Sequence, residues 1–313
     1  MFKLKVLITP RGFANNGLDQ IRRMEDKGLS VDYNDTGLQY SSQTFLNKAR
    51  NSDAIIVGVD KIDKNIIDSC PNLKVICKFG VGTDNIDMDY AKRKKIIVCK
   101  TIGSNSNAVA EHVMALIYCW SKNLYTTINS VKKSSWTKLT GTEIRGKTLG
   151  ILGFGEIGKQ LARQADGIGM NVLVNDVCKI PIEIVNKYHV KEVSKNDIYR
   201  NADYISLHLP LLDTTKNMIS TQQLKEMKKS AVLVNAARGG IVDEKALYVA
   251  LKNHEIQAAC FDVFSVEPPA QNEPLLKLSN FLLTSHTAAR TVEADQRTCV
   301  ISTNAVLKHL RII

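Results

Sequence analysis

The chain has 313 residues, a formal net charge of +11 and 44% hydrophobic residues. This length suggests two domains, and the composition is that of a soluble globular protein. No run of about eighteen apolar residues predicts a membrane span. The N-terminal sequence MFKLKVLITP has too short an apolar run for a secretory signal and begins a predicted strand. We therefore expect a cytoplasmic protein that does not enter a membrane.

The positive charge predicts a lysine-rich solvated surface rather than a nucleic-acid-binding one. No zinc-finger, basic-zipper or aromatic-studded basic pattern accompanies it. The densest basic run, Lys92-Arg93-Lys94-Lys95, follows a predicted helix, whose negative end favours cations. The seven cysteines include no CxxC pair, and most lie in apolar runs. We therefore expect reduced core thiols and no metal site, and a small anionic partner remains compatible with the charge.

Apolar strand patterns alternate with amphipathic helical patterns along almost the whole chain. The first part of the chain contains predicted strands at 5–9, 54–59, 75–79 and 96–99. A long, largely apolar helix is predicted from about Asn107 to Lys133, and we expect it to be buried or to lie in an interface. The second part contains predicted strands at 148–153, 171–176, 204–209, 231–236, 258–263 and 281–286, and a helix at about 290–310. This alternation predicts two α/β domains with parallel sheets.

A glycine-rich sequence, Gly153-Phe154-Gly155-Glu156-Ile157-Gly158, lies between a predicted strand and a predicted helix. That context is what a dinucleotide-binding fingerprint requires. The first glycine permits a tight turn, the second leaves room for a pyrophosphate, and the third lets helix and strand pack closely. Asp176 ends the next strand, eighteen residues after Gly158 (176 − 158). A carboxylate there binds the adenosine ribose hydroxyls and repels a 2′-phosphate, so we predict NAD rather than NADP.

Polar or ionisable residues follow the last four predicted strands. They are His208 and Pro210, Asn235 and Arg238, Asp262 and Glu267, and finally His286. For any one of them, a residue in a surface loop is the simpler interpretation. The carboxyl ends of parallel strands meet at one edge of the sheet, where ligands bind. Four such strands after a nucleotide fingerprint therefore favour a functional site.

The residue types at this edge suit one reaction. Arg238 can bind a carboxylate through two parallel hydrogen bonds and polarise a neighbouring carbonyl. His286 can exchange a proton near neutral pH, and Glu267 can orient the imidazole and stabilise its charged form. Together with NAD, these groups predict hydride transfer to and from a 2-oxo acid. Their spacing in the sequence does not show that the three side chains meet.

The chain resembles the D-isomer-specific 2-hydroxyacid dehydrogenases over nearly its whole length. Within that family it is most similar to the D-3-phosphoglycerate dehydrogenases, in a short form without a regulatory domain. The densest similarity lies in KFGVGTDNID (78–87), GTEIRGKTLGILGFGEIG (141–158), SLHLPLLDTTKNMI (206–219), NAARGGIVDE (235–244) and FDVFSVEPP (261–269). Together these motifs are highly specific.

The resemblance implies a role for particular residues. Arg238, Glu267 and His286 match the catalytic set. Asp262 matches the residue that faces the nicotinamide amide. The full set of implied cofactor-binding residues is Gly153, Gly155, Glu156, Ile157, Gly158, Asp176, His208, Leu209, Pro210, Ala236, Ala237 and Asp262. The implied substrate-binding residues are Gly80, Val81, Gly82, Asn105 and Arg238.

The resemblance also implies an architecture. A Rossmann NAD-binding domain, residues 102–288, is expected as an insertion in a flavodoxin-like substrate domain, residues 1–101 plus 289–313. Both domains are expected to be doubly wound parallel sheets. The long helix after Asn105 matches the family's dimer-forming region, so a homodimer is expected.

The sequence departs from the family pattern in two places, and these keep several functions open. Val59-Asp60-Lys61 stands where phosphoglycerate dehydrogenases carry an Arg-Ser pair whose arginine binds substrate. Ser285 precedes His286 in place of proline, and Thr287-Ala288-Ala289 follows in place of Gly-Ala. We therefore expect either oxidation of 3-phosphoglycerate to 3-phosphohydroxypyruvate or, as the alternative, a glyoxylate or hydroxypyruvate reductase. A non-catalytic NAD-sensing binding module, or a paralogue with a misplaced histidine loop, are the remaining hypotheses.

Overall fold

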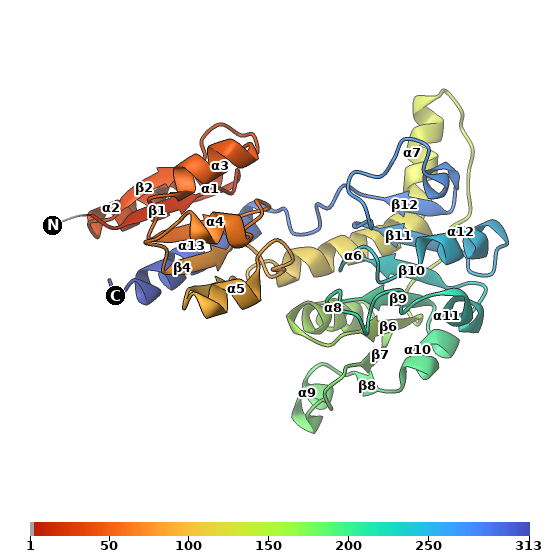
Figure 1. Ribbon diagram of the computed structural model, residues 1–313. Coiled ribbons are helices and arrows are strands. Elements are labelled where there is room, and N and C mark those ends of the chain that lie inside the picture. Colours follow the sequence, from red (N-terminus) through yellow and green to blue (C-terminus); the bar gives the residue numbers. More distant parts are fainter. Residues whose placement is uncertain (1–2) are drawn as a thin grey trace. The chain divides into compact units, whose positions relative to one another are not determined.

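A computed structural model describes residues 3–313 and contains two α/β units, each built on its own parallel sheet (Figure 1). One unit comprises residues up to Asn105 together with Arg290–Ile313, and the other comprises Ser106–Ala289. Every strand pairing within both sheets is parallel. The predicted fold class, α/β with two doubly wound parallel sheets, is confirmed.

The first unit has five strands in the order β2-β1-β3-β4-β5, which is the flavodoxin-like order. The strands are β1 (Lys5–Ile8), β2 (Ser30–Tyr33), β3 (Ala54–Val57), β4 (Val75–Lys78) and β5 (Ile97–Lys100). The helices are α1 (Phe13–Asn16), α2 (Leu18–Asp26), α3 (Ser42–Ala49), α4 (Lys64–Asp68), α5 (Met88–Arg93) and α13 (Val292–His309).

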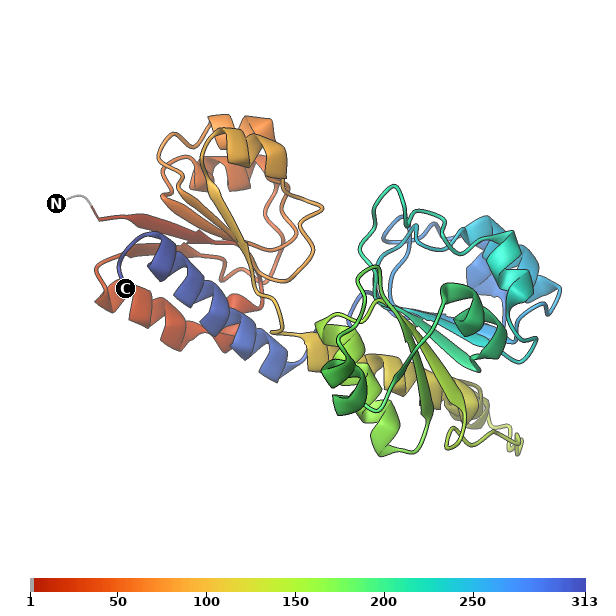
Figure 2. The same cartoon turned by 90° about the horizontal axis from the view of Figure 1, so that it is seen from below.

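Helices cover both faces of this first sheet. Figure 2 shows α2 and α13 on one side and α3 to α5 on the other. Along β1, Val6 and Ile8 pack with buried residues of α2 and α13, whereas Leu7 packs with those of α3 and α4. Because successive strand residues point to opposite faces, a sheet covered on both sides needs an uninterrupted apolar run. KVLIT and AIIVGV are such runs.

The second unit has seven strands in the order β12-β11-β10-β9-β6-β7-β8. If β6 is numbered as strand 1 of this unit, the sheet taken from its β8 edge has the order 3-2-1-4-5-6-7. Its first six strands thus follow the Rossmann order. The strands are β6 (Thr148–Leu152), β7 (Asn171–Asn175), β8 (Lys191–Glu192), β9 (Tyr204–Leu207), β10 (Val232–Asn235), β11 (Ala258–Phe261) and β12 (Phe281–Leu283). The helices are α6 (Ser106–Ser121), α7 (Leu124–Lys132), α8 (Glu156–Gly167), α9 (Ile182–Lys187), α10 (Lys195–Asn201), α11 (Thr221–Glu226), α12 (Glu244–Lys252) and the 3-10 turn η1 (Pro274–Lys277).

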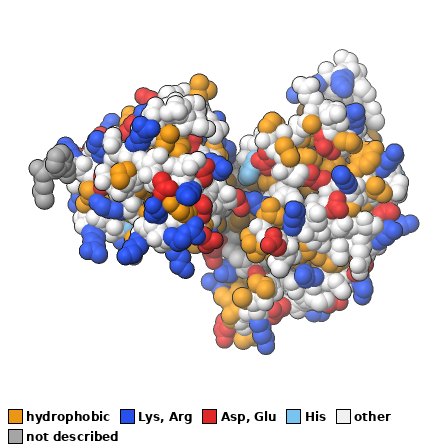
Figure 3. Space-filling view, in the orientation of Figure 1, with side chains coloured by type: hydrophobic (Ala, Val, Ile, Leu, Met, Phe, Trp, Pro, Cys, Tyr) orange, Lys and Arg blue, Asp and Glu red, His pale blue; other side chains and the backbone are white. Residues whose placement is uncertain are grey.

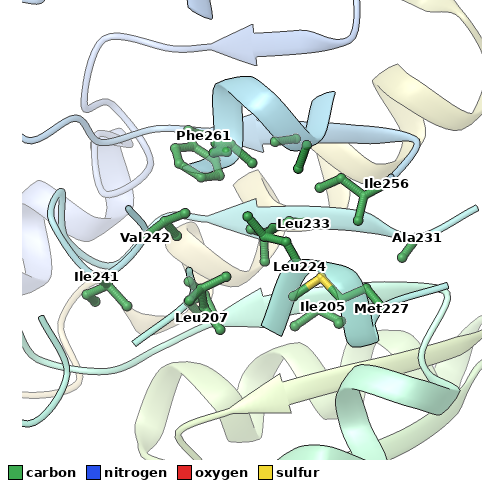
Figure 4. Close-up of a cluster of buried hydrophobic side chains, with 14 of the residues drawn as sticks. Ile205, Leu207, Leu224, Met227, Ala231, Leu233, Ile241, Val242, Ile256 and Phe261 are labelled. Carbon is green, nitrogen blue, oxygen red and sulfur yellow. The ribbon is translucent and has the colours of Figure 1, made fainter. Parts of the chain in front are cut away.

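Two apolar cores hold this second sheet. One lies between the sheet and α6 and α8, and the other between the sheet and α10 to α12. Figure 4 shows part of the latter core, where Ile205, Leu233 and Phe261 from three neighbouring strands meet Leu224 of α11. Burial of a side chain of this size stabilises the fold by about 1.5–3 kcal/mol. The polar residues at the strand ends are therefore held by a sheet that is packed on both faces.

The predicted long helix from Asn107 to Lys133 is wrong in one respect, because the structure divides it. α6 ends at Ser121 and α7 begins at Leu124. Between them Asn123 has a φ of 54°, in the left-handed region that interrupts a helix. α6 is largely buried, whereas α7 contains no buried residue. Within residues 3–313, no helix combines the length and apolarity needed to cross a membrane.

The densest basic run lies at the end of α5. Figure 3 shows Lys and Arg side chains gathered over this helix. The Nζ atom of Lys94 pairs with Asp68 at 2.7 Å, and both Arg93 and Lys94 lie over the ring of Tyr90. The run is therefore engaged in contacts on the surface of the first unit itself.

Candidate active site

The three fingerprint glycines have different surroundings in the loop between β6 and α8. Gly153 has a φ of 97°, and a Cβ there would collide with the carbonyl oxygen of His208. A Cβ on Gly158 would lie 2.5 Å from the carbonyl oxygen of Gly153. A Cβ on Gly155 would meet no atom within 4 Å. Two of the glycines therefore allow close packing of the protein, and the third leaves open space beside bare backbone.

The start of α8 can bind an anion. Gly155 is its N-cap and provides no side-chain hydrogen bond, so the first N–H groups of the helix have no cap. Glu156 and Ile157 form the first turn. Uncapped amides and the positive end of a helix suit a phosphate group, and the open space at Gly155 provides room for one.

Asp176 follows β7 and lies beside the glycine loop. Its Oδ2 atom accepts a hydrogen bond from the Phe154 N–H at 2.7 Å, and its Oδ1 atom accepts one from the Cys178 N–H at 3.1 Å. The carboxylate is partly exposed. It therefore lies where a ribose bound next to the glycine loop would find an acceptor.

His208 follows β9 and packs against the first glycine. Burial lowers its pKa to about 4, so the imidazole is neutral at pH 7. Its Nε2 atom lies 2.9 Å from the Ser206 hydroxyl, and its buried Nδ1 atom has no partner among the described residues. An unpartnered polar atom next to the glycine loop is consistent with a ligand there. Leu209 is partly buried and Pro210 is exposed.

His286 and Glu267 lie together. β12 ends at Leu283, so His286 lies in the loop three residues further on rather than in the strand. Its Nδ1 atom is 2.7 Å from Glu267 Oε2, and Glu267 Oε1 accepts the Phe264 N–H at 2.9 Å. The side chains of His286 and Glu267 are 50% and 38% exposed. With Nδ1 bonded to the carboxylate, Nε2 is the ring nitrogen left for a substrate.

Arg238 lies in the loop after β10. The side chain of the buried Asn235 stabilises this loop through hydrogen bonds to its backbone. The Asn235 side chain donates to the Arg238 carbonyl at 2.9 Å and accepts the Ala237 N–H at 3.1 Å. Arg238 Nη1 donates to the Ala237 carbonyl at 2.7 Å. Ala236 is half-buried beside them.

Gly239 brings the Arg238 loop against the loop that leads to Glu267. A Cβ on Gly239 would overlap the carbonyl group of Phe264. Ser265, the next residue, in turn donates its N–H to Glu244 at 2.8 Å. The sequence ARGG therefore places Arg238 and Glu267 on two loops in direct backbone contact.

Asp262 is buried, with 1% of its surface exposed. Its Oδ1 atom accepts the Thr284 hydroxyl at 2.5 Å and the Thr287 N–H at 2.9 Å, and its Oδ2 atom accepts the Ala288 N–H at 2.8 Å. Both carboxylate oxygens are thus engaged with the loop that carries His286. Contact between Asp262 and a nicotinamide amide stays a prediction.

The remaining candidate residues belong to the first unit. Gly80, Val81 and Gly82 follow β4, and Gly80 has a φ of 135° and donates its N–H to Thr101 Oγ1 at 2.8 Å. Val81 is 39% exposed. Asn105, the last residue of this unit before the second begins, has a buried Oδ1 atom without a partner among residues 3–313.

Asp60, one of the departures from the family pattern, is turned into the first unit. It is buried, and its Oδ2 atom accepts the Thr9 hydroxyl at 2.5 Å. Lys61 is exposed and pairs with Asp63 at 3.4 Å. A cavity of about 380 Å³ beside this loop is lined by residues that include Tyr40, Gln43, Asp60 and Lys61.

One residue of the second unit, His112, was missed in the sequence. It lies on α6, and its Nε2 atom is 3.0 Å from Thr284 Oγ1 and 3.5 Å from Asp262 Oδ1. Its place in the largely apolar sequence AVAEHVMALIY gave no signal for this contact, which joins segments 172 residues apart in the sequence. No cluster of three or more His, Cys, Asp or Glu that could hold a metal is found within residues 3–313.

Comparison with known proteins identifies the family. The model for the NAD binding domain of D-isomer specific 2-hydroxyacid dehydrogenases matches residues 114–288, more than half of the chain. The chain belongs to this family, as its motifs predicted.

Individual relatives fall into more than one functional group. D-3-phosphoglycerate dehydrogenase of Methanocaldococcus jannaschii is 40% identical over 280 residues, covering 88% of this chain and 53% of that protein. Hydroxypyruvate reductase of Thermotoga maritima is 37% identical over 262 residues, covering 82% and 84%. A structure of D-lactate dehydrogenase from Aquifex aeolicus, complexed with NAD and lactic acid, has a TM-score of 0.83 at 27% identity and covers 98% and 95%. The chain spans about half the length of the phosphoglycerate dehydrogenases it matches.

Proposed function

We propose that the protein is an NAD-dependent oxidoreductase that transfers a hydride between nicotinamide and a D-2-hydroxy acid or its 2-oxo acid. The observation that carries this proposal is the 2.7 Å contact between His286 Nδ1 and Glu267 Oε2. It lies at the same edge of the same sheet as the glycine loop, within the part of the chain that matches the family's NAD-binding domain. The D stereochemistry follows from the family alone.

The proposed cofactor site uses the glycine loop and the strand ends beside it. A pyrophosphate would lie against Gly155 and the amides of Glu156 and Ile157, and Asp176 would accept the ribose hydroxyls. The other proposed contacts are those implied by the resemblance, namely Gly153, Gly158, His208, Leu209, Pro210, Ala236, Ala237 and Asp262. Asp176 supports NAD over NADP, because its carboxylate would repel a 2′-phosphate.

The proton chemistry is assigned to His286. Bound nicotinamide supplies or accepts the hydride. During reduction of a 2-oxo acid, the Nε2–H of the His286 imidazolium protonates the carbonyl oxygen as it becomes a hydroxyl. During oxidation the neutral Nε2 accepts the hydroxyl proton. Glu267 holds the ring through Nδ1 and balances the positive charge of the imidazolium. This keeps the ring protonated before reduction and stabilises the imidazolium that forms during oxidation.

Arg238 is assigned to the substrate carboxylate. A guanidinium binds a carboxylate with two parallel hydrogen bonds and draws electron density from the adjacent carbonyl. We also propose that the first unit is the substrate domain. Its Gly80-Val81-Gly82 backbone amides and Asn105 would contribute further contacts to the substrate. The second unit, with the glycine loop, would be the NAD-binding domain.

Two substrates are proposed within this class. Oxidation of 3-phosphoglycerate is supported by the 40% identity to a protein described as a phosphoglycerate dehydrogenase. Reduction of hydroxypyruvate or glyoxylate is supported by Val59-Asp60-Lys61, which stands where phosphoglycerate dehydrogenases carry an Arg-Ser pair whose arginine binds substrate. The Asp60 carboxylate accepts the Thr9 hydroxyl, and its negative charge would disfavour a phosphate group nearby.

The test is NADH oxidation with 3-phosphohydroxypyruvate, hydroxypyruvate, glyoxylate and pyruvate. Turnover of the phosphorylated acid alone would support the first substrate, and preference for the small acids would support the second. Arg238→Ala and His286→Ala should each lower kcat/KM about 10²- to 10⁴-fold. Turnover that survives both substitutions would refute the assigned roles, and the absence of dinucleotide binding would refute the function.

We further propose a homodimer that forms through α7. This helix has no buried residue, and Leu124, Ile128 and Val131 form an exposed apolar stripe at helical spacing. Trp136 and Leu139 are exposed just beyond it. An apolar surface of this kind marks an interface more often than a solvent-facing helix. Sedimentation of the purified chain at micromolar concentration measures its oligomeric state, and a monomer would refute the proposal.

A further inference from the structure

His286 has a backbone conformation that its loop must hold in place. Its φ is 55°, in the left-handed region that is uncommon for residues with a side chain. Glu267 fixes only the ring, through Nδ1. The backbone that follows His286 is fixed by Asp262, whose two oxygens accept the N–H groups of Thr287 and Ala288 at 2.9 and 2.8 Å. The position of His286 therefore depends on the position of the Asp262 carboxylate.

The hydroxyl of Thr284 links this carboxylate to a histidine. Asp262 is buried, so its charge must be satisfied by protein groups. Thr284 has one hydroxyl proton, and the 2.5 Å contact to Asp262 Oδ1 uses it in preference to the Phe261 carbonyl at 3.3 Å. The Thr284 oxygen is then an acceptor toward His112 Nε2 at 3.0 Å. This proton count places a hydrogen on Nε2 of His112.

The helix that carries His112 is firmly anchored. α6 buries Ala110, Val113 and Met114 against the core of the second unit. His112 itself is mostly buried, with 22% of its side chain exposed, and its Nε2 atom also lies 3.5 Å from Asp262 Oδ1. A chain of hydrogen bonds thus runs from a rigid helix, through Thr284 and Asp262, to the two amides next to His286.

We propose that His112 is a positioning residue for His286, acting through Thr284 and Asp262 without contact to the substrate. This rests on the proposed function, in which His286 exchanges a proton with the substrate. Without the Nε2 donor, Thr284 loses one partner, and its hydroxyl is free to rotate away from the carboxylate. Asp262 then holds the loop less firmly, and the imidazole is displaced from the reacting oxygen.

Three variants isolate this contact. His112→Leu removes the donor and retains an apolar side chain of similar bulk, whereas His112→Gln keeps an N–H donor within reach of Thr284. His189→Leu is the matched control. Its Nδ1 atom is 2.9 Å from an aspartate oxygen of Asp166, but it lies next to β8, at the opposite edge of the same sheet from β12.

The first measurement is steady-state reduction of hydroxypyruvate and glyoxylate by NADH, catalysed by the 313-residue chain. We expect His112→Leu to lower kcat about 10- to 100-fold, the effect of a misplaced catalytic group. The Kd for NADH and the melting temperature should stay near those of the wild type. His112→Gln should regain most of the lost kcat, and His189→Leu should lose none. Wild-type kcat in His112→Leu, or equal loss in His112→Leu and His112→Gln, would overturn the proposal.

The second measurement does not need turnover. In protein labelled with ¹³C at histidine Cε1, the His286 resonance is identified by its loss in His286→Asn. We expect His112→Leu to shift or broaden that resonance, His112→Gln to restore it and His189→Leu to leave it unchanged. If the wild type reduces no 2-oxo acid, the proposed function fails and this spectrum decides the positioning role alone. A His286 resonance that does not move in His112→Leu overturns the inference.

Discussion

Gly155 offers the most direct test of the cofactor site, because the protein itself leaves the space beside it empty. A Cβ at this position meets no atom within 4 Å. The φ of −74° is one that any L-amino acid adopts. Gly155→Ala should therefore fold as stably as the wild type. If a pyrophosphate lies against this backbone, however, the added methyl group occupies part of its place.

The expected loss of affinity follows from the hydrogen bonds that the methyl group disrupts. A phosphate pushed back from the start of α8 loses at least one charge-assisted bond to a backbone N–H, which contributes about 1.5–3 kcal/mol. This corresponds to NADH binding that is roughly 10- to 150-fold weaker. Titration of NADH fluorescence measures the Kd. Thermal unfolding should differ by less than about 2 °C.

Gly158→Ala is the matched comparison within the same motif. Its Cβ would lie 2.5 Å from the Gly153 carbonyl oxygen and 3.3 Å from Ile151 Cγ2, so α8 has to move away from β6. This variant should lose melting temperature as well as NADH affinity. Wild-type affinity in Gly155→Ala would show that the pyrophosphate does not bind at this loop. Equal destabilisation of both variants would show that a side chain at Gly155 does meet other atoms of the protein, contrary to the structure.

Three further outcomes are expected. Asp176→Ser should raise the affinity for NADPH relative to NADH about tenfold, measured by titration with both, because the repelling carboxylate is gone. For His208 the folded pKa of about 4 lies below the ordinary value of 6.5, so its contribution to stability is present above pH 6.5 and lost as the pH falls toward 4. Urea unfolding across that range should show about 3 kcal/mol of loss that His208→Gln lacks. Gly239→Ala should lower kcat about 100-fold in steady-state NADH oxidation, because its Cβ overlaps the Phe264 carbonyl and separates two loops of the site.

The sequence predicted the sheets well because both are covered on two faces. Central strands such as β3 and β10 are fully buried and read as continuous apolar runs. The strands that were missed are β2 and β8, which lie at sheet edges. Their sequences, SVDY and KE, are polar because one side faces solvent. Pairing with a neighbour makes them strands, and that information lies in the partner, not in the segment.

The same limit applies to the site. The glycine fingerprint could be interpreted because its three roles are local, within one turn between a strand and a helix. The contact of His286 with Glu267 joins residues 19 positions apart through two loops, and the spacing alone leaves it open. The contact of His112 with Thr284 spans 172 positions and has no pattern at all. Local geometry was predictable, and contacts formed by tertiary packing were not.

The residues beside His286 that depart from the family pattern still form the backbone hydrogen bonds that hold its loop. Thr287 and Ala288 hold the loop through their backbone N–H groups, which every residue except proline provides. Their side chains can therefore differ from the family pattern without releasing Asp262. Thr284 is different, because its hydroxyl is the group that bonds both Asp262 and His112. A change at Thr284, which lies two residues before His286, should therefore disturb the site more than the departures at Ser285 and at Thr287-Ala288-Ala289.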